Sequence, residues 1–197
     1  ASAGSEGDPV SLAIRRTAEF EHNKKILICS TPTVRGASRI ELAWKESDQR
    51  EYFVPCPICG HFQVLVLGDG TGPGLVWPEG HPEDAAYRCA GCMQLIPHHQ
   101  KAWMVENGEY RAQNPDSQIP GFRVTQLISP KRSWGTIAAE FCEARRAPET
   151  LKAFVNTVLA DLWEERHDQQ IDHLAIWNRC EPYAAEVPDG VAVITAG

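Results

Sequence analysis

The stretch VPCPICGHF, residues 54–62, carries Cys56 and Cys59, and the related stretch YRCAGCMQL, residues 87–95, carries Cys89 and Cys92. A Cys-x-x-Cys turn presents two thiolates from one tight loop, and two such turns supply the four soft ligands of a tetrahedral metal site. Gly60 directly follows the first pair and can take the positive φ that such a turn favours. The pattern therefore predicts a closed, structural four-cysteine site with no coordination position left for water.

The expected metal of this site is zinc, but iron in the same cysteine cage, or an empty site, stays open from the sequence. A thioredoxin-like redox pair is disfavoured, because that motif occurs once and opens a helix. Residues 60–88 separate the two pairs, which is longer than the roughly 15–20 residues of the usual zinc pattern. A hairpin with a long tip over 68–74 fills that distance. His61 and His81 are expected to stay outside the metal site.

Composition describes an ordinary folded chain and excludes several classes of protein. The 197 residues are 43% hydrophobic and 23% charged, and no apolar run approaches the roughly 20 residues that span a bilayer. We expect no secretory signal and a reduced, cytoplasmic setting for the seven cysteines, with Cys29 as a small buried hydrophobe. The net charge of −7 argues against a wholly basic DNA-binding surface.

Local patterns predict an α/β chain with helices on both sides of the cysteine region. Asp8 as N-cap and Pro9 at the first helical position predict a helix over 8–21. The apolar run 26–29 predicts a buried strand of a parallel sheet. Further helices are expected over 38–46, 98–107, 133–146 and 148–165. Strand candidates are 50–57, 62–67 and 190–197, and residues 119–130 are expected to be strand and loop.

Five stretches in order resemble the large subunit of phage terminase, the lambda-type gpA DNA-packaging family. They are KKILICSTPTVRG (24–36), CPICG (56–60), YRCAGC (87–92), GFRVTQLISPKRSW (121–134) and LKAFVNTVLADLWEE (151–165). The resemblance covers nearly the whole chain. It implies a parent protein in which a P-loop ATPase domain drives DNA into the capsid and an RNase-H-like nuclease domain cuts the DNA.

The resemblance also implies a division of the chain into four parts. Residues 1–50 would be the C-terminal part of the ATPase domain, at the edge of a P-loop ATPase-type sheet, and 51–125 a zinc-ribbon-like insert. Residues 126–186 would be a helical linker region, and 187–197 the first strand of a truncated nuclease domain. The sequence has no GxxxxGK[ST] loop and no cluster of nuclease carboxylates at its end, so we expect a non-catalytic internal fragment.

Two further candidate sites are proposed, the first from the resemblance and the second from the local residues. The loop with Ser30, Thr31, Thr33 and Arg35 is expected to couple the nucleotide state to movement; the alternative is a plain turn that caps the next helix. The cations of Lys131 and Arg132 beside the ring of Trp134 are the best local candidate for contact with a phosphate and a base or sugar face; a solvated turn before the next helix is the favoured alternative.

The implied cofactors are structural Zn²⁺ in this chain and ATP with Mg²⁺ in the parent enzyme. Implied partners are double-stranded viral DNA, the terminase small subunit and the portal, in an oligomeric motor in the host-cell cytoplasm, with no membrane. One rival hypothesis is a stand-alone zinc-ribbon module that binds nucleic acid or protein. A second is a rubredoxin-like electron carrier, which a red colour would reveal.

Overall fold

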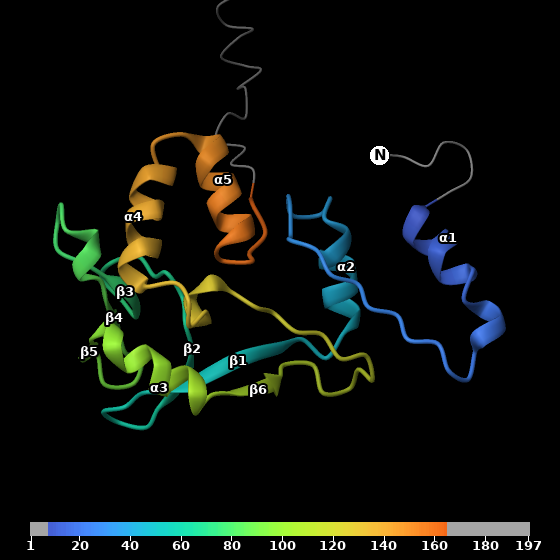
Figure 1. Ribbon diagram of the computed structural model, residues 1–197, viewed down its shortest axis with the longest axis horizontal. Coiled ribbons are helices and arrows are strands. Elements are labelled where there is room, and N and C mark those ends of the chain that lie inside the picture. Colours follow the sequence, from blue (N-terminus) through green and yellow to red (C-terminus); the bar gives the residue numbers. More distant parts are fainter. Residues whose placement is uncertain (1–7, 165–197) are drawn as a thin grey trace, which may run out of the picture. The chain divides into compact units, whose positions relative to one another are not determined.

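The computed structural model describes residues 8–164, in which the strands form two small antiparallel sheets (Figure 1). The first sheet has the order β2-β1-β6 and contains β1 (Arg50–Pro55), β2 (Phe62–Val64) and β6 (Glu109–Ala112). The second has the order β3-β4-β5 and contains β3 (Gly74–Val76), β4 (Ala86–Arg88) and β5 (Leu95–Ile96). Each Cys-x-x-Cys turn connects two paired strands, the first β1 to β2 and the second β4 to β5.

Two helices late in the described part form a hairpin and lie side by side (Figure 1). These are α4 (Trp134–Ala144) and α5 (Pro148–Thr157). The hydroxyl of Ser133 accepts a hydrogen bond from the N–H of Thr136 at 2.9 Å, which satisfies an orphan donor of the first turn of α4. Pro148 occupies the start of α5, where no N–H is needed. The remaining helices are α1 (Pro9–Arg15), α2 (Arg39–Glu46) and α3 (Lys101–Glu106), with 3₁₀ turns η2 (Ala18–Phe20), η3 (Pro82–Asp84), η4 (His98–Gln100) and η5 (Gln126–Ile128).

Trp134 joins the helices to the second sheet. Its side chain is 0% exposed, its ring lies 5.7 Å from that of Tyr87 on β4, and its Nε1 donates to the carbonyl of Leu127 at 3.3 Å. Tyr87 in turn accepts from the N–H of Val66 at 3.2 Å and donates to the carbonyl of Val64 at 3.3 Å. Burial raises the pKa of Tyr87 to about 12, so its hydroxyl keeps the proton that it donates. One core therefore connects both sheets and α4.

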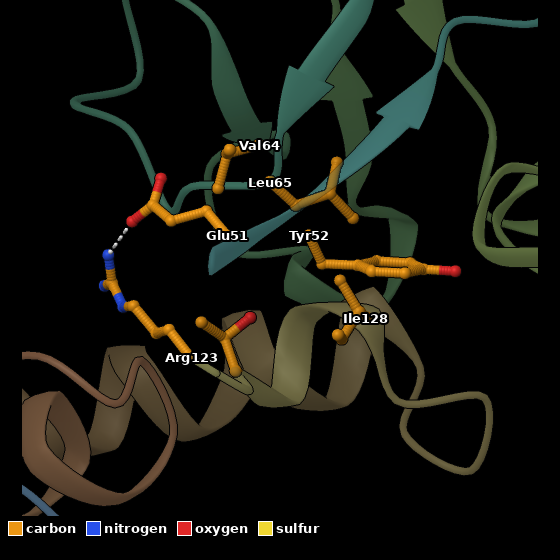
Figure 2. A pocket seen from close by; sticks show the side chains of 7 residues that line it. Glu51, Tyr52, Val64, Leu65, Arg123 and Ile128 are labelled. Carbon is orange, nitrogen blue, oxygen red and sulfur yellow. Dashed lines mark hydrogen bonds and ion pairs between the residues drawn. The ribbon is translucent and has the colours of Figure 1, made fainter. Parts of the chain in front are cut away.

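Arg123 ties the first sheet to the end of α5. Its guanidinium pairs with Glu51 on β1 at 3.0 Å and lies beside a small cavity that Tyr52 also lines (Figure 2). The same guanidinium donates to the carbonyls of Leu159 and Ala160 at 3.1 and 3.2 Å. A planar guanidinium suits such a junction, because its five donors point in fixed directions.

The structure confirms a mixed helix and strand composition and most of the expected elements. Asp8 caps α1 by accepting from the N–H of Ser11 at 2.9 Å, as predicted. Ser38 stands at the N-cap of α2, but its hydroxyl accepts from the N–H of Thr33 instead of from its own helix. Helix α5 ends at Thr157, well before the expected residue 165. Among the described residues no helix is long and apolar enough to cross a membrane.

The buried strand expected over 26–29 is absent, and that prediction is wrong. Leu27 is 91% exposed, and Ile26 and Ile28 are 46% and 44% exposed. Residues 25–32 make no backbone hydrogen bond to another described residue. An apolar run becomes a strand only beside a neighbour that pairs with its N–H and C=O groups, and none of the described strands lies there. Cys29, expected to be buried, is exposed for the same reason. The strand expected over 190–197 lies outside the described residues.

Gly135 should not tolerate a side chain, because α4 begins against the backbone of η3. A Cβ at Gly135 would lie 2.6 Å from the carbonyl oxygen of Glu83, a backbone atom that cannot rotate away. Gly135→Ala should lower the free energy of unfolding by about 1–3 kcal/mol, despite the better helix propensity of alanine. The measurement is denaturant unfolding. Gly72→Ala is the control, since its Cβ would meet nothing nearer than 3.5 Å and should change stability by less than about 0.5 kcal/mol. Equal stability of the two variants would contradict the close packing.

Candidate metal centre

The four predicted cysteines come together at one point between the two sheets. Their sulfurs all lie within 4.8 Å of one another, with Cys56 Sγ 4.0 Å from Cys92 Sγ and Cys59 Sγ 3.8 Å from Cys89 Sγ. A tetrahedral ion bonded to four sulfurs at roughly 2.3 Å would hold them about 3.8 Å apart. The sulfurs are therefore spaced as zinc or iron tetrathiolates require, and each cysteine pair contributes half of the cage.

The two cysteine turns are built alike, although their sequences differ. In the first, Gly60 N–H donates to the carbonyl of Cys56 at 2.9 Å, and in the second Met93 N–H donates to the carbonyl of Cys89 at 3.0 Å. Gly60 and Met93 hold the same place, directly after the second cysteine, and both have positive φ, 72° and 59°. Positive φ is free for glycine but costs an L-residue roughly 1–2 kcal/mol, so the second turn is strained.

Backbone N–H groups point at two of the sulfurs. Ile58 N lies 3.4 Å from Cys56 Sγ, and Gly91 N lies 3.2 Å from Cys89 Sγ. Burial raises the pKa of the Cys56 thiol to about 12. Burial also raises the pKa of Cys89, but hydrogen bonds from the N–H groups of Cys92 and Gly91, together with those from the thiols of Cys56 and Cys92, outweigh it and bring that pKa to about 7. The cage thus favours at least one thiolate near neutral pH, and thiolates are the form that binds metal.

Gln63 on β2 holds the second cysteine turn against the first sheet, a role that the sequence did not reveal. Its side chain is 4% exposed, and its Oε1 accepts from the N–H of Ala90, between Cys89 and Gly91, at 2.7 Å. The only signal in the sequence is a polar residue at an inward position of a strand.

His61 packs against Gly91, where a Cβ would lie 2.7 Å from the Cβ of His61. Neither His61 nor His81 belongs to the cysteine group; His81 instead lies close to the exposed carboxylates of Glu83 and Asp84.

The hydroxyl loop after residue 29 lines a groove that the four cysteines of the cage do not line. Ser30 and Thr31 are exposed and line this groove, which has a volume of about 420 Å³. The end of the loop is fixed to α2, because Thr33 N–H donates to Ser38 Oγ at 3.1 Å and Gly36 N–H donates to the carboxylate of Glu41 at 2.6 Å. The Lys45 ammonium bonded to Glu41 helps to hold the pKa of that carboxyl below its usual range. A turn held by the following helix matches the plainer alternative for this loop, and its coupling role stays a prediction.

The structure separates the three residues expected to contact nucleic acid. Lys131 is exposed, whereas Arg132 is ion-paired with Glu140. Trp134 is fully buried, so its ring is not accessible to a base. The turn that carries them is fixed by Lys101, which is 2% exposed and donates from Nζ to the carbonyl of Arg132 at 2.6 Å. Burial lowers the pKa of Lys101 to about 8.

Two family models cover most of the chain. The model described as "Phage terminase large subunit gpA, ATPase domain" matches residues 1–110, and "Terminase large subunit gpA, endonuclease domain" matches residues 119–197. The first match contains all four cysteines of the cage and the hydroxyl loop. The second contains α4, α5 and Lys131. The first match ends within β6 at residue 110, and the second begins before η5 at residue 119.

Two curated relatives are similar over almost the whole chain. "Terminase, large subunit" of Enterobacteria phage P21 is 32% identical over 215 residues, and the protein of the same description from Escherichia phage lambda is 31% identical over 214 residues. Each alignment covers 98% of this chain, and the chain spans about a third (33%) of the length of each relative. No solved structure matches the chain significantly.

Met93→Gly should relieve the strain in the second cysteine turn. Glycine adopts the φ of 59° without a Cβ clash, so the metal-bound protein should gain roughly 0.5–1 kcal/mol in free energy of unfolding over Met93→Ala, which keeps the strained backbone. Gly60→Ala should shift stability by a similar amount in the opposite direction. Denaturant unfolding of the three variants measures both effects. Equal stabilities for Met93→Gly and Met93→Ala would contradict the strain.

Proposed function

The chain belongs to the gpA family of phage terminase large subunits, and from this membership we propose that it forms part of an ATP-driven motor and endonuclease that cuts viral DNA and packages it into the capsid. The observation that carries the proposal is the order of matches, an ATPase model over 1–110 and an endonuclease model over 119–197. A stand-alone zinc-ribbon module is disfavoured, because such a module would not match both models. ATP and Mg²⁺ are the proposed cofactors of the whole enzyme.

The proposed partners follow from the same membership. They are double-stranded viral DNA, the terminase small subunit and the portal, in an oligomeric motor acting in the host-cell cytoplasm. Within this chain Lys131 is the proposed phosphate contact, since it is exposed and sits on a turn that Lys101 fixes from inside. Arg132 could join it only by leaving Glu140.

The cysteine cage is proposed to be a structural zinc site of the zinc-ribbon kind. The spacing of its sulfurs fits a tetrahedral ion, and all four positions are filled by protein, which leaves none for a reacting water. When bound, the metal would supply a cross-link between two cysteine turns that belong to different sheets. Hydrogen bonds of the chain itself, made by Gln63 and by backbone N–H groups, hold the two cysteine turns in place.

The loop with Ser30, Thr31, Thr33 and Arg35 is proposed to couple the nucleotide state of the motor to movement. Exposed hydroxyls of Ser30 and Thr31 line a groove large enough for a ligand or a neighbouring loop. The two ends of the loop differ, because Thr33 is fixed by α2 whereas residues 25–32 make no backbone-to-backbone hydrogen bond within the described chain. A segment free at one end and anchored at the other can change position without unfolding its anchor.

Metal analysis tests the zinc proposal. The purified protein should contain one zinc per chain, and Cys89→Ser should lose most of it, because three thiolates with a hydroxyl bind zinc far more weakly than four thiolates. Cys142→Ser is the matched control, since Cys142 lies on α4 outside the cage and its loss should leave zinc content unchanged. Iron in place of zinc, together with a red colour of the protein, would identify the site as an iron site and contradict the assignment of zinc. No stoichiometric metal, or full zinc in Cys89→Ser, would end the proposal.

Thr31→Ala tests the coupling role in the full-length gene product. The substitution removes the hydroxyl that is proposed to contact the phosphate of the nucleotide, so DNA-stimulated ATP hydrolysis should slow about tenfold or more. Thr71→Ala is the control, because Thr71 is also exposed in a loop and its hydroxyl donates to Asp69, two residues before it, while its bond from Arg88 uses the backbone carbonyl that alanine keeps. Turnover and translocation at the unmodified rate in Thr31→Ala would remove the coupling role from this loop.

A further inference from the structure

Asn156 is a buried polar residue in the middle of an apolar pattern. It lies on α5, two residues after Phe154 and two residues before Val158, and it is only 9% exposed. With its amide nitrogen directed at the two nearby carbonyls, it donates to Thr33 O at 3.2 Å and to Asp161 O at 3.0 Å. A buried amide without partners costs free energy, so this orientation is the one that the surroundings select.

The two carbonyls belong to segments far apart in sequence. Thr33 ends the hydroxyl loop, and Asp161 lies in the turn that follows α5. The segments also pair directly through a parallel bridge between Val34 and Trp163. In that bridge Trp163 N–H donates to Thr33 O and Arg35 N–H donates to Trp163 O, both at 2.9 Å. Asn156 and Trp163 therefore converge on one oxygen, the carbonyl of Thr33, whose two lone pairs they both use.

This pairing joins the two parts of the chain that the family models match separately. Thr33 lies within the range of the ATPase model, and Asn156 and Trp163 lie within that of the endonuclease model. The groove beside the pairing is lined from both ranges, by Ser30 and Thr31 on one side and by Asn156 and Asp161 on the other. The hydroxyl loop therefore ends where it contacts the last turn of α5 and the segment that follows that helix.

We propose that Asn156 is a positioning residue for the hydroxyl loop: its amide fixes the carbonyls of Thr33 and Asp161 and so ties the loop to the segment that follows α5. The assignment of a motor role to that loop rests on the proposed function. The tie itself rests on the contacts. Any displacement of Thr33 must break or carry with it the bonds to Asn156 and Trp163, so the position of the loop and that of the segment after α5 are linked.

Hydrogen exchange of Asn156→Asp in the full-length gene product tests the tie. Aspartate has nearly the same shape, but a carboxylate cannot donate and would face two carbonyl oxygens. Amides in peptides that cover 33–36 and 160–163 should exchange roughly tenfold faster, while those of β1 stay as protected as before. Asn107→Asp is the matched control, because Asn107 donates to the carbonyl of Trp103 at the exposed end of α3 and should leave both peptides unchanged.

Unchanged exchange at 33–36 and 160–163 in Asn156→Asp would overturn the proposal, and so would an equal acceleration in β1, which would mean general destabilisation. Asn156→Ala gives a second reading, with a smaller acceleration because no new charge is introduced. ATP turnover of Asn156→Asp is then measured. Reduced turnover at unchanged KM for ATP supports positioning of the loop. Faster local exchange with normal turnover would remove the motor role of the loop and leave the tie intact, which separates the two claims.

Discussion

The constraint on which the described structure depends most is the meeting of four sulfurs between two sheets that are too small to stand alone. The strands of the second sheet have three, three and two residues, and the first sheet has only one strand longer than four residues. Sheets of this size need packing against other elements for stability. The cage closes the turn of one hairpin onto the turn of the other, and Gln63 and Tyr87 then add hydrogen bonds between the sheets.

From this pair of sheets the structure extends in two directions. Trp134 and Tyr87 fasten α4 to the second sheet, and α5 packs on α4 through Phe141 and Phe154, whose rings lie 5.6 Å apart. On the other side, Arg123 connects Glu51 of the first sheet to the carbonyls at the end of α5. The end of α5 is therefore fixed by the sheets through Arg123 and meets the hydroxyl loop through Asn156. Under the proposed motor role, this framework would give the hydroxyl loop a rigid surface against which to move.

The sequence predicted best where local chemistry determines the structure. The cysteine cage, the positive φ at Gly60, the Asp8 cap of α1 and the Ser133 cap of α4 were all readable from a few neighbouring residues. Features that depend on distant partners were not. The apolar run at Leu27 looked like a strand, but no strand is present to pair with it.

Single residues with two possible environments were the hardest to predict. Trp134 follows two cations and was expected at the surface, yet it fills the core. Asn156, Gln63 and Lys101 are polar residues whose importance comes from a buried carbonyl or N–H supplied by another part of the chain. Their neighbours in the sequence do not identify that distant partner, so only the fold could reveal it. The same holds for Met93, whose positive φ is set by the second cysteine turn.

Extended X-ray absorption fine structure of the bound metal, measured on the purified full-length gene product, tests most directly whether the four cysteines form a closed metal site. A closed cage of Cys56, Cys59, Cys89 and Cys92 predicts a first shell of four sulfurs at about 2.3 Å, with no nitrogen or oxygen neighbour. Fewer than four sulfurs, or a nitrogen or oxygen in the first shell, would contradict the account. Such a shell would mean that the site is open, or that a residue other than these cysteines completes it.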